Sequence, residues 1–308
     1  MLSITIGLSF LALARAESAQ ATTNMSSGAM PTARTLERGP SRASVSSEIY
    51  EKLSYYAQFP TSAGSPCANP PSGLVEQLYI SNNKTDTQAA IYRLDARKEF
   101  ILAIPGTNGN MDVLTDLNIP LVTYNVATGP PCENCKAHTG FLNGWNSIAT
   151  DVERGLESAL QSYPEYTITI AGHSLGGALG ELAFGSLKPK PLPVKQVLTY
   201  GAPRVGNREY ADYIDSLSGA SDSDAGVAYR VTHFDVPEDV VPHLPPFFIG
   251  YRHPRTEFWQ STDEPTQDTT YRCYGQEALD CILSQVASVS SDAHGTYAGM
   301  KNICSGSK

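Results

Sequence analysis

The 308-residue chain carries little charge and is short of basic residues. Charged residues make up 17% of the sequence, and 22 lysines and arginines stand against 31 aspartates and glutamates, a formal net charge of −9. Nucleic-acid binding is not expected, because phosphate recognition needs clustered lysine and arginine. Like charges never run together over about five residues, so an electrostatic tail is not expected either.

Long hydrophobic runs are also absent. No segment approaches the roughly eighteen apolar residues that a membrane-spanning helix needs. The apolar stretch at residues 2–13 is too short to span, and the small residues of Ala14-Arg15-Ala16 follow it, as at a signal-peptidase site. We therefore predict a signal peptide at residues 1–16 and a secreted protein. The alternative for residues 2–13 is a short N-terminal core helix.

The next segment, residues 17–38, has little apolar content and is rich in Ser, Thr, Ala and Met. This composition predicts a pro-segment or a disordered spacer, with Arg34 or Arg38 as a possible processing site. Two Asn-x-Ser/Thr sequons occur, at Asn24 and Asn83. We expect only Asn83 to remain in the mature chain, where an apparent turn makes glycosylation plausible.

From residue 39 onward the chain reads as one domain in which strands alternate with helices. That alternation predicts an α/β fold with a central, mostly parallel sheet flanked by helices. β-branched and alternating segments predict strands at residues 75–80, 89–94, 100–104, 166–171, 194–200 and 228–233. Apolar residues at helical spacing predict helices at residues 46–58, 145–163, 175–187 and 208–217.

The six cysteines are an even number, which in a secreted chain indicates disulfides. The sequence alone does not choose among the possible pairings. Cys132 and Cys135 form a Cys-x-x-Cys pair, but no second pair lies at zinc spacing. A tight local disulfide is therefore favoured over a metal site, and no metal is expected.

The sharpest motif is Gly-His-Ser-Leu-Gly at residues 172–176, between a predicted strand and a predicted helix. A strand-to-helix turn this tight requires small residues on both sides of the serine and holds its hydroxyl above the end of the sheet. The start of the following helix favours negative charge beside that hydroxyl. Ser174 is therefore the candidate nucleophile; the alternative is a glycine-rich turn with an incidental serine.

A serine hydroxyl needs a histidine base, which a carboxylate orients. In folds with this turn the order along the chain is serine, acid, histidine. The residues alone leave several choices open. The histidines after Ser174 are His233, His243, His253 and His294, and the nearby carboxylates are Asp235, Glu238 and Asp239.

An ester carbonyl under attack also needs hydrogen-bond donors where its oxygen becomes negative. The backbone N–H of Leu175, directly after the serine, is one candidate. A second is Thr107, which follows the predicted strand 100–104 through Pro105 and Gly106 and offers both an N–H and a hydroxyl. The alternative for this loop is an ordinary Pro-Gly turn.

Several further motifs give the chain a likeness to a known family. From about residue 46 to residue 304 it resembles the fungal class 3 lipases, an α/β-hydrolase group, and especially the branch that contains the type A feruloyl esterases. The motifs that carry the resemblance lie at residues 163–166, 171–177, 200–207, 229–233, 239–246, 250–253, 257–259 and 293–297.

The resemblance implies an α/β-hydrolase fold with a short lid and assigns the site residues. It makes Ser174 the nucleophile, Asp239 the acid and His294 the base. It also makes Thr107 and Leu175 the oxyanion donors.

Two departures from the family pattern concern this site. The spacing after residues 229–233 places Asp235 nearer the usual position of the acid, whereas the Val-Val-Pro that follows matches Asp239, which we prefer. Before Thr107, Ile104-Pro105-Gly106 stands where relatives generally carry Phe-Arg-Gly. Pro105 removes a backbone donor and stiffens the loop.

The cysteines match the feruloyl esterase branch as well. That match implies three disulfides, Cys67–Cys304, Cys132–Cys135 and Cys273–Cys281.

In this family the segment after the oxyanion threonine covers the site as a lid. Here Met111, Leu114 and Leu117 are three residues apart and form one apolar face of a short predicted helix. The alternative is a loop whose apolar residues pack inward. Ile119 stands where the phenolic-ester branch has an aromatic residue, and Val113 stands near the usual lid tryptophan of lipases.

These features favour a site built for acyl chains, to which residues 245–249 could add an apolar wall. We expect a secreted serine lipase that hydrolyses acylglycerol esters through an acyl-enzyme intermediate at an oil–water interface. A feruloyl esterase acting on plant cell-wall esters is the alternative, and a non-catalytic lipid-binding protein on the same scaffold is a third hypothesis. We expect a monomer that uses no cofactor and no metal.

Overall fold

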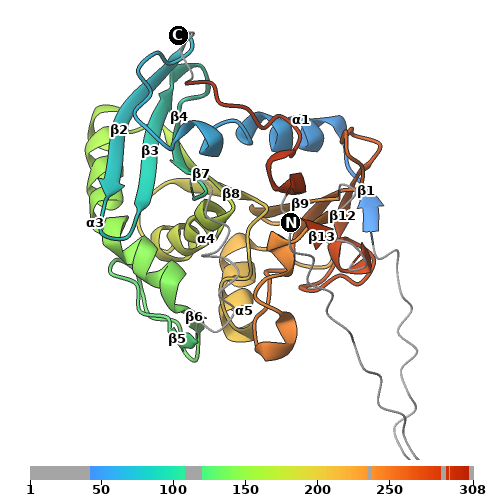
Figure 1. Cartoon of the computed structure of the whole chain (residues 1–308). Helices are drawn as coiled ribbons and strands as arrows, with labels where there is room; N and C mark the ends of the chain where they lie inside the picture. The colour runs from blue at the N-terminus through green and yellow to red at the C-terminus, as the bar shows by residue number, and fades with distance from the viewer. Residues whose placement is uncertain (1–41, 108–119, 235–237, 286–288, 291, 305–308) are drawn as a thin grey trace, which may run out of the picture. The chain divides into compact units, whose positions relative to one another are not determined.

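A central sheet organises the part of the chain that the computed structural model describes, residues 42–107, 120–234, 238–285, 289–290 and 292–304. These residues belong to one unit, residues 39–308 (Figure 1). The nine strands of the sheet lie in the order β1 (Arg42–Ser44), β12 (Thr270–Cys273), β11 (Glu257–Gln260), β9 (Ala228–His233), β8 (Val194–Tyr200), β7 (Thr167–His173), β4 (Glu99–Ile104), β3 (Thr87–Leu94) and β2 (Leu74–Asn82).

The centre of the sheet is parallel and its edges are antiparallel. Strands β4, β7, β8, β9 and β11 pair in parallel with one another. On one side β3 and β2 follow antiparallel, and on the other β12 and β1 do so. The expected central, mostly parallel sheet is therefore confirmed.

Helices cover both faces of the sheet (Figure 1). On one face lies α1 (Ser47–Tyr56), and on the other lie α3 (Thr139–Ser162), α4 (Leu175–Leu187) and α5 (Arg208–Ser218). Each face of the sheet has its own hydrophobic core, and alternate side chains of β4 point into one or the other. Phe100 lies on the side of α3 and α4, whereas Ile101 lies on the side of α1. Burial on both faces explains why residues 100–104 of this strand read as a continuous apolar run.

Two parts of the sequence prediction need correction. Helix α3 begins at Thr139 rather than at residue 145, because the His138 side chain accepts a hydrogen bond from the Phe141 N–H (3.3 Å) and caps the helix earlier. Strands β1, β11 and β12 were not expected at all. They are three or four residues long, too short to display an alternating pattern.

Smaller elements complete the described structure. Two further sheets have two strands each, β5 (Leu121–Thr123) with β6 (Lys136–His138), and β10 (Glu238–Asp239) with β13 (Val289–Ser290). The short 3-10 turns are η1 (Pro60–Ser62), η2 (Asp95–Arg97), η3 (Val241–His243), η4 (Phe247–Ile249), η5 (Ile282–Gln285) and η6 (Asp292–Gly295).

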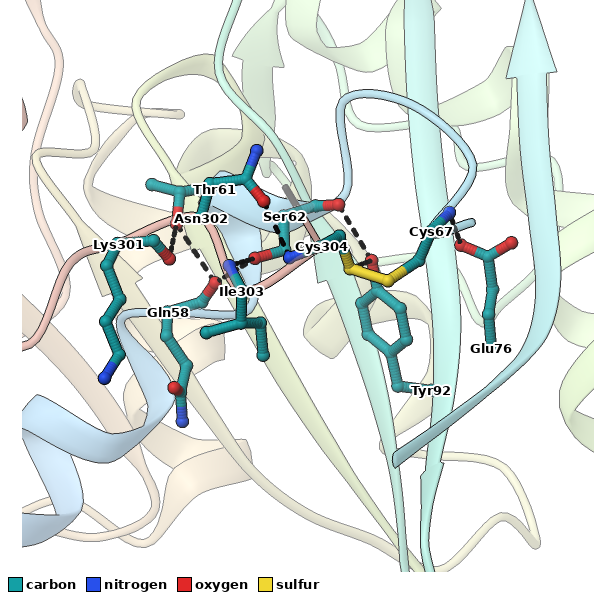
Figure 2. The surroundings of a disulfide bond; sticks show 10 residues. All are labelled: Gln58, Thr61, Ser62, Cys67, Glu76, Tyr92, Lys301, Asn302, Ile303 and Cys304. Carbon is teal, nitrogen blue, oxygen red and sulfur yellow. Dashed lines mark hydrogen bonds between the residues drawn. A yellow bond between two sulfur atoms is a disulfide. The ribbon is translucent and has the colours of Figure 1, made fainter. Parts of the chain in front are cut away.

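The cysteines are joined in the pairs that the family resemblance implies. The bonds are Cys67–Cys304, Cys132–Cys135 and Cys273–Cys281. Figure 2 shows how the first one joins the C-terminal segment to Cys67, in the loop between η1 and β2, while hydrogen bonds hold the same segment against η1. There the Ile303 N–H donates to Ser62 Oγ (2.9 Å), and Thr61 Oγ1 donates to the Lys301 carbonyl oxygen (2.7 Å).

Other predictions concern the ends of the chain and its surface. The predicted signal peptide (1–16), the predicted pro-segment or spacer (17–38) and the predicted lid residues Met111, Leu114 and Leu117 lie outside the described residues. Asn83 is exposed in the turn between β2 and β3. Among the described helices, none has the length and apolar character needed to cross a bilayer.

Candidate active site

Ser174 lies at the turn between β7 and α4, with left-handed backbone angles (φ 57°, ψ −127°) that a serine rarely adopts. The flanking glycines explain why the turn exists. A Cβ on Gly172 would lie 2.1 Å from the carbonyl oxygen of Gly176, and one on Gly176 would lie 2.2 Å from that of Ile104. Only glycine fits at either position, so the residues of the motif enforce the sharp turn that the sequence predicts.

The loop after β4 lies directly against this turn. A Cβ on Gly106 would be 2.9 Å from Ser174 Cβ and 3.2 Å from His173 Nδ1. Thr107 follows, partly buried, and is the last described residue before the segment 108–119. On the other side Leu175 is the first residue of α4. Both sequence-predicted oxyanion donors therefore belong to segments that meet at Ser174.

Asp239 and His294 form a buried pair. The His294 Nδ1 lies 2.9 Å from one carboxylate oxygen of Asp239 and 3.0 Å from the other. Strands β10 and β13 bring the two residues together across 55 positions of sequence, because Asp239 pairs in register with Ser290 shortly before the turn that carries His294.

Two more groups hold the Asp239 carboxylate, which is fully buried. The Val241 N–H donates to one oxygen (2.9 Å) and the Tyr297 hydroxyl donates to the other (2.5 Å). Gly201, at the end of β8, makes room for this cluster, because a Cβ there would be 2.9 Å from His294 Cε1. These contacts fix the orientation of the carboxylate beside the imidazole.

The other ring nitrogen of His294, Nε2, is buried and has no hydrogen-bond partner among the described residues. Next to it, His173 Nε2 lies 2.7 Å from the carbonyl oxygen of His294, and the two rings are 4.7 Å apart. Burial lowers the pKa of His173 to about 4, with a smaller contribution from His294. A neutral His173 donates to that carbonyl and steadies the segment of His294. His173 and Tyr297 lie within the recognised motifs, but sequence reasoning gave neither of them a role.

The remaining candidates have other partners or lie elsewhere. His233 contacts the Thr262 carbonyl oxygen (2.8 Å) and Thr296 Oγ1 (3.0 Å). His253 contacts the Pro242 carbonyl oxygen (2.9 Å), and burial lowers its pKa well below the usual value.

The other carboxylates are less informative. Asp235 and the side chain of Glu238 lie outside the described residues. Within the described part of the chain, no cluster of three or more His, Cys, Asp or Glu side chains could hold a metal ion.

A serine on a strained strand-to-helix turn, a loop with donors beside it and a buried Asp–His pair at the same end of a parallel sheet define a serine hydrolase site on an α/β-hydrolase fold. Comparisons with known proteins give the family. Residues 101–249 match the model of the class 3 lipases. The lipase of Rhizomucor miehei is 30% identical over 280 residues, which cover 85% of this chain and 72% of the relative. The chain therefore belongs to the class 3 lipase family.

Two further likenesses agree with this assignment. The secreted mono- and diacylglycerol lipase 1 of Fusarium solani is 34% identical over 180 residues, 58% of this chain. The matched part spans only about half (49%) of that relative's length. The crystal structure of a lipase from Rhizopus microsporus var. chinensis superposes with a TM-score of 0.75 at 27% identity, covering 88% of this chain and 94% of that one.

Proposed function

We propose that this chain is a secreted serine lipase that hydrolyses the ester bonds of acylglycerols. The observation that carries the proposal is the buried Asp239–His294 pair, which lies against His173, the residue directly before Ser174. An imidazole that a carboxylate holds in one tautomer is the base that a serine nucleophile requires.

In the first half of the proposed reaction, Ser174 Oγ attacks the ester carbonyl carbon and its proton passes to His294 Nε2. Asp239 stabilises the imidazolium that forms and keeps the ring in place. The tetrahedral intermediate then collapses, and the alcohol leaves with the proton from His294. In the second half, water attacks the acyl-enzyme with His294 again as base, and the fatty acid departs.

Charge develops on the carbonyl oxygen, and we assign its stabilisation to Leu175 and Thr107. The Leu175 N–H stands at the start of α4, where the helix dipole favours an anion. Thr107 follows Gly106, which lies in close contact with Ser174. The loss of one such donor typically lowers the rate by about 10²–10³.

The substrate class rests on the relatives and on the sequence. Both relatives described above are named lipases, one of them for mono- and diacylglycerols. We infer that residues 108–119 form a lid whose apolar residues Met111, Leu114 and Leu117 meet lipid at an oil–water interface. We also infer a signal peptide at residues 1–16, a pro-segment or spacer at 17–38, and a glycan on exposed Asn83.

Hydrolysis of emulsified triglyceride, measured beside soluble methyl ferulate, tests the proposal. Wild type should hydrolyse the emulsion at a rate that rises sharply above the substrate's solubility limit, and Ser174→Ala should not. Turnover of the ferulate alone would instead identify a feruloyl esterase. A Ser174→Ala variant that kept wild-type activity would contradict the proposed nucleophile.

A further inference from the structure

Four large apolar side chains are exposed on two separate segments of the described structure. Phe247 (41% exposed), Phe248 (76%) and Ile249 (46%) form turn η4, and Leu279 (78%) lies in the loop between Cys273 and Cys281. Single exposed apolar residues need no explanation, but a group of them on one surface usually marks an interaction site. We call these four residues the Phe248–Leu279 surface.

The two segments face each other across one hollow of about 430 Å³. Its walls are mainly apolar. The lining residues are Arg204, His243, Leu244, Pro246, Phe247, Phe248, Leu279 and Leu283. Phe247, Phe248 and Leu279 of the Phe248–Leu279 surface line this hollow, so the apolar side chains of the two segments form one continuous surface.

Buried Arg204 ties the two segments together. Its guanidinium donates to both carboxylate oxygens of Glu277 (2.9 and 2.8 Å), two residues before Leu279. It also donates to the carbonyl oxygens of His243 (2.6 Å) and Pro245 (3.1 Å), just before η4. A bidentate pair of this kind fixes geometry as well as energy.

Further bonds hold the backbone beneath the exposed side chains. The guanidinium of Arg252 donates to the carbonyl oxygen of Phe247 (3.0 Å), and the Cys273–Cys281 disulfide closes the loop that carries Leu279. The apolar side chains are thus presented on braced backbone. A rigid surface that remains exposed loses little conformational entropy when it binds.

The charges around the hollow indicate the kind of partner. Arg204, which lines it, is neutralised by Glu277, and Arg252 is engaged with backbone carbonyls. Arg252 keeps its positive charge, but Arg204 is neutralised and the chain as a whole carries a net charge of −9. An apolar surface with a single unpaired arginine beside it, on a chain of net negative charge, suits a neutral lipid surface better than an anionic membrane.

The position of the surface also matters. Turn η3 (Val241–His243) joins η4 to Asp239, and the Val241 N–H is bonded to the Asp239 carboxylate. The η4 part of the surface and the candidate catalytic acid therefore belong to one short, continuous segment. Contact with lipid at η4 would hold the acid's own loop at the lipid boundary.

We propose that the Phe248–Leu279 surface docks this protein on the surface of neutral lipid, separately from any contact that residues 108–119 make. The inference rests on the proposed lipase function, because that function supplies the neutral lipid. Phe248 and Leu279 enter the lipid boundary, and the braced turns behind them set the orientation of the molecule.

Flotation of full-length protein with triolein droplets tests this proposal, with every variant made in the Ser174→Ala background so that binding is read without hydrolysis. Phe248→Ser with Leu279→Ser should weaken droplet binding by at least about tenfold, because two large apolar side chains no longer leave water. The matched control is Val75→Ser with Leu78→Ser, which alters two exposed apolar residues (38% and 37%) on β2 and should bind as the parent does. Phe248→Trp should also retain binding, since it keeps an aromatic side chain at the boundary.

The hydrolysis of dissolved p-nitrophenyl acetate separates docking from chemistry. With Ser174 restored, Leu279→Ser alone should keep this rate within about twofold of wild type, because Leu279 lies outside the candidate catalytic residues and outside the apolar wall expected at residues 245–249. Unchanged droplet binding in the double variant would overturn the proposal. The proposal would also be overturned if wild type were a dimer and the double variant were a monomer that still bound droplets as tightly. If wild type hydrolysed no ester, the proposed function would fail while the flotation result still stood.

Discussion

The contacts of Asp239 favour it as the carboxylate that orients the His294 imidazole. Its side chain is buried, accepts bonds from the Val241 N–H and the Tyr297 hydroxyl, and lies 2.9 Å from the histidine nitrogen. Those contacts orient the carboxylate before a substrate arrives, which is the preorganisation that a triad needs.

We predict that Asp239→Asn lowers kcat by about 10³–10⁴ with little change in folding, because the amide favours the wrong tautomer of His294. Asp235→Asn, the matched change four residues earlier, should leave kcat within about twofold. Steady-state hydrolysis of a soluble ester with circular dichroism checks both. A large loss in Asp235→Asn and none in Asp239→Asn would transfer the role of the acid to Asp235.

For single residues, chemical reasoning on the sequence was enough to predict Ser174, but it was not enough to choose the acid and the histidine. Gly172 and Gly176 flank Ser174 in a recognisable pattern, and the structure shows that no other residue fits there. The choice of Asp239 and His294 needed the family resemblance, because these residues are 55 positions apart in sequence and their contact depends on the pairing of β10 with β13. A two-residue strand has no periodicity to detect.

Glycine residues allow the start of helix α4 to pack closely against the central sheet. Its first turn packs so closely on β4 and β7 that Gly176 has no room for a Cβ. One turn further, Gly180 is different: a Cβ there would lie 3.5 Å from the nearest atom, a methyl carbon of Ile170, which is an ordinary contact.

We predict that Gly176→Ala unfolds the chain or abolishes activity, since the added carbon would be 2.2 Å from the Ile104 carbonyl oxygen. The matched Gly180→Ala change should be tolerated and should raise the free energy of unfolding by up to about 1 kcal/mol, because alanine favours a helix interior. Thermal unfolding and soluble-ester hydrolysis of both variants would check this. An equal loss of stability and activity in the two variants would contradict the claim that the strand and helix pack more tightly at Gly176 than at Gly180.

Element by element, the central strands and helices were predictable because burial leaves a pattern. In β4 every side chain is buried, and residues 100–104 read as a continuous apolar run that predicts the strand, although Glu99 at its start does not. β11 carries Glu257, whose charge reads as solvent-exposed. The structure buries that carboxylate against the Arg230 guanidinium (3.1 Å), a long-range pairing that local sequence does not reveal.

Across the whole molecule, several buried titratable groups make stability depend on pH in opposite directions. Burial lowers the pKa of His138 and of His173 to about 4 each. Burial also raises the pKa of Glu181, on α4, to about 8, although Arg230 opposes the shift. In the unfolded chain these groups would titrate near their ordinary values, 6.5 for histidine and 4.5 for glutamate.

The signs follow from which state binds the proton. Below pH 6.5 the unfolded chain protonates its histidines and the native state does not, so the free energy of unfolding falls as the pH drops toward 4, by about 1.4 kcal/mol per pH unit for each histidine. Above pH 4.5 the unfolded chain ionises Glu181 first, so its contribution falls as the pH rises toward 8.

We predict that Glu181→Gln becomes progressively more stable relative to wild type as the pH rises from 5 to 8, because the amide has no proton to release. Denaturant unfolding of both proteins at pH 5, 6.5 and 8 measures the difference. A difference that stays constant over this range would show that Glu181 does not titrate as its burial requires.

The most direct test of the central claim, that His294 and Asp239 activate Ser174, is covalent labelling. A p-nitrophenyl alkylphosphonate reacts with an activated serine and releases nitrophenol, and mass spectrometry of the digested protein locates the adduct. We predict one stoichiometric adduct on Ser174 in wild type and a rate at least about 10³-fold lower in His294→Ala. Labelling of another residue, or equal labelling of Ser174 without His294, would contradict the account.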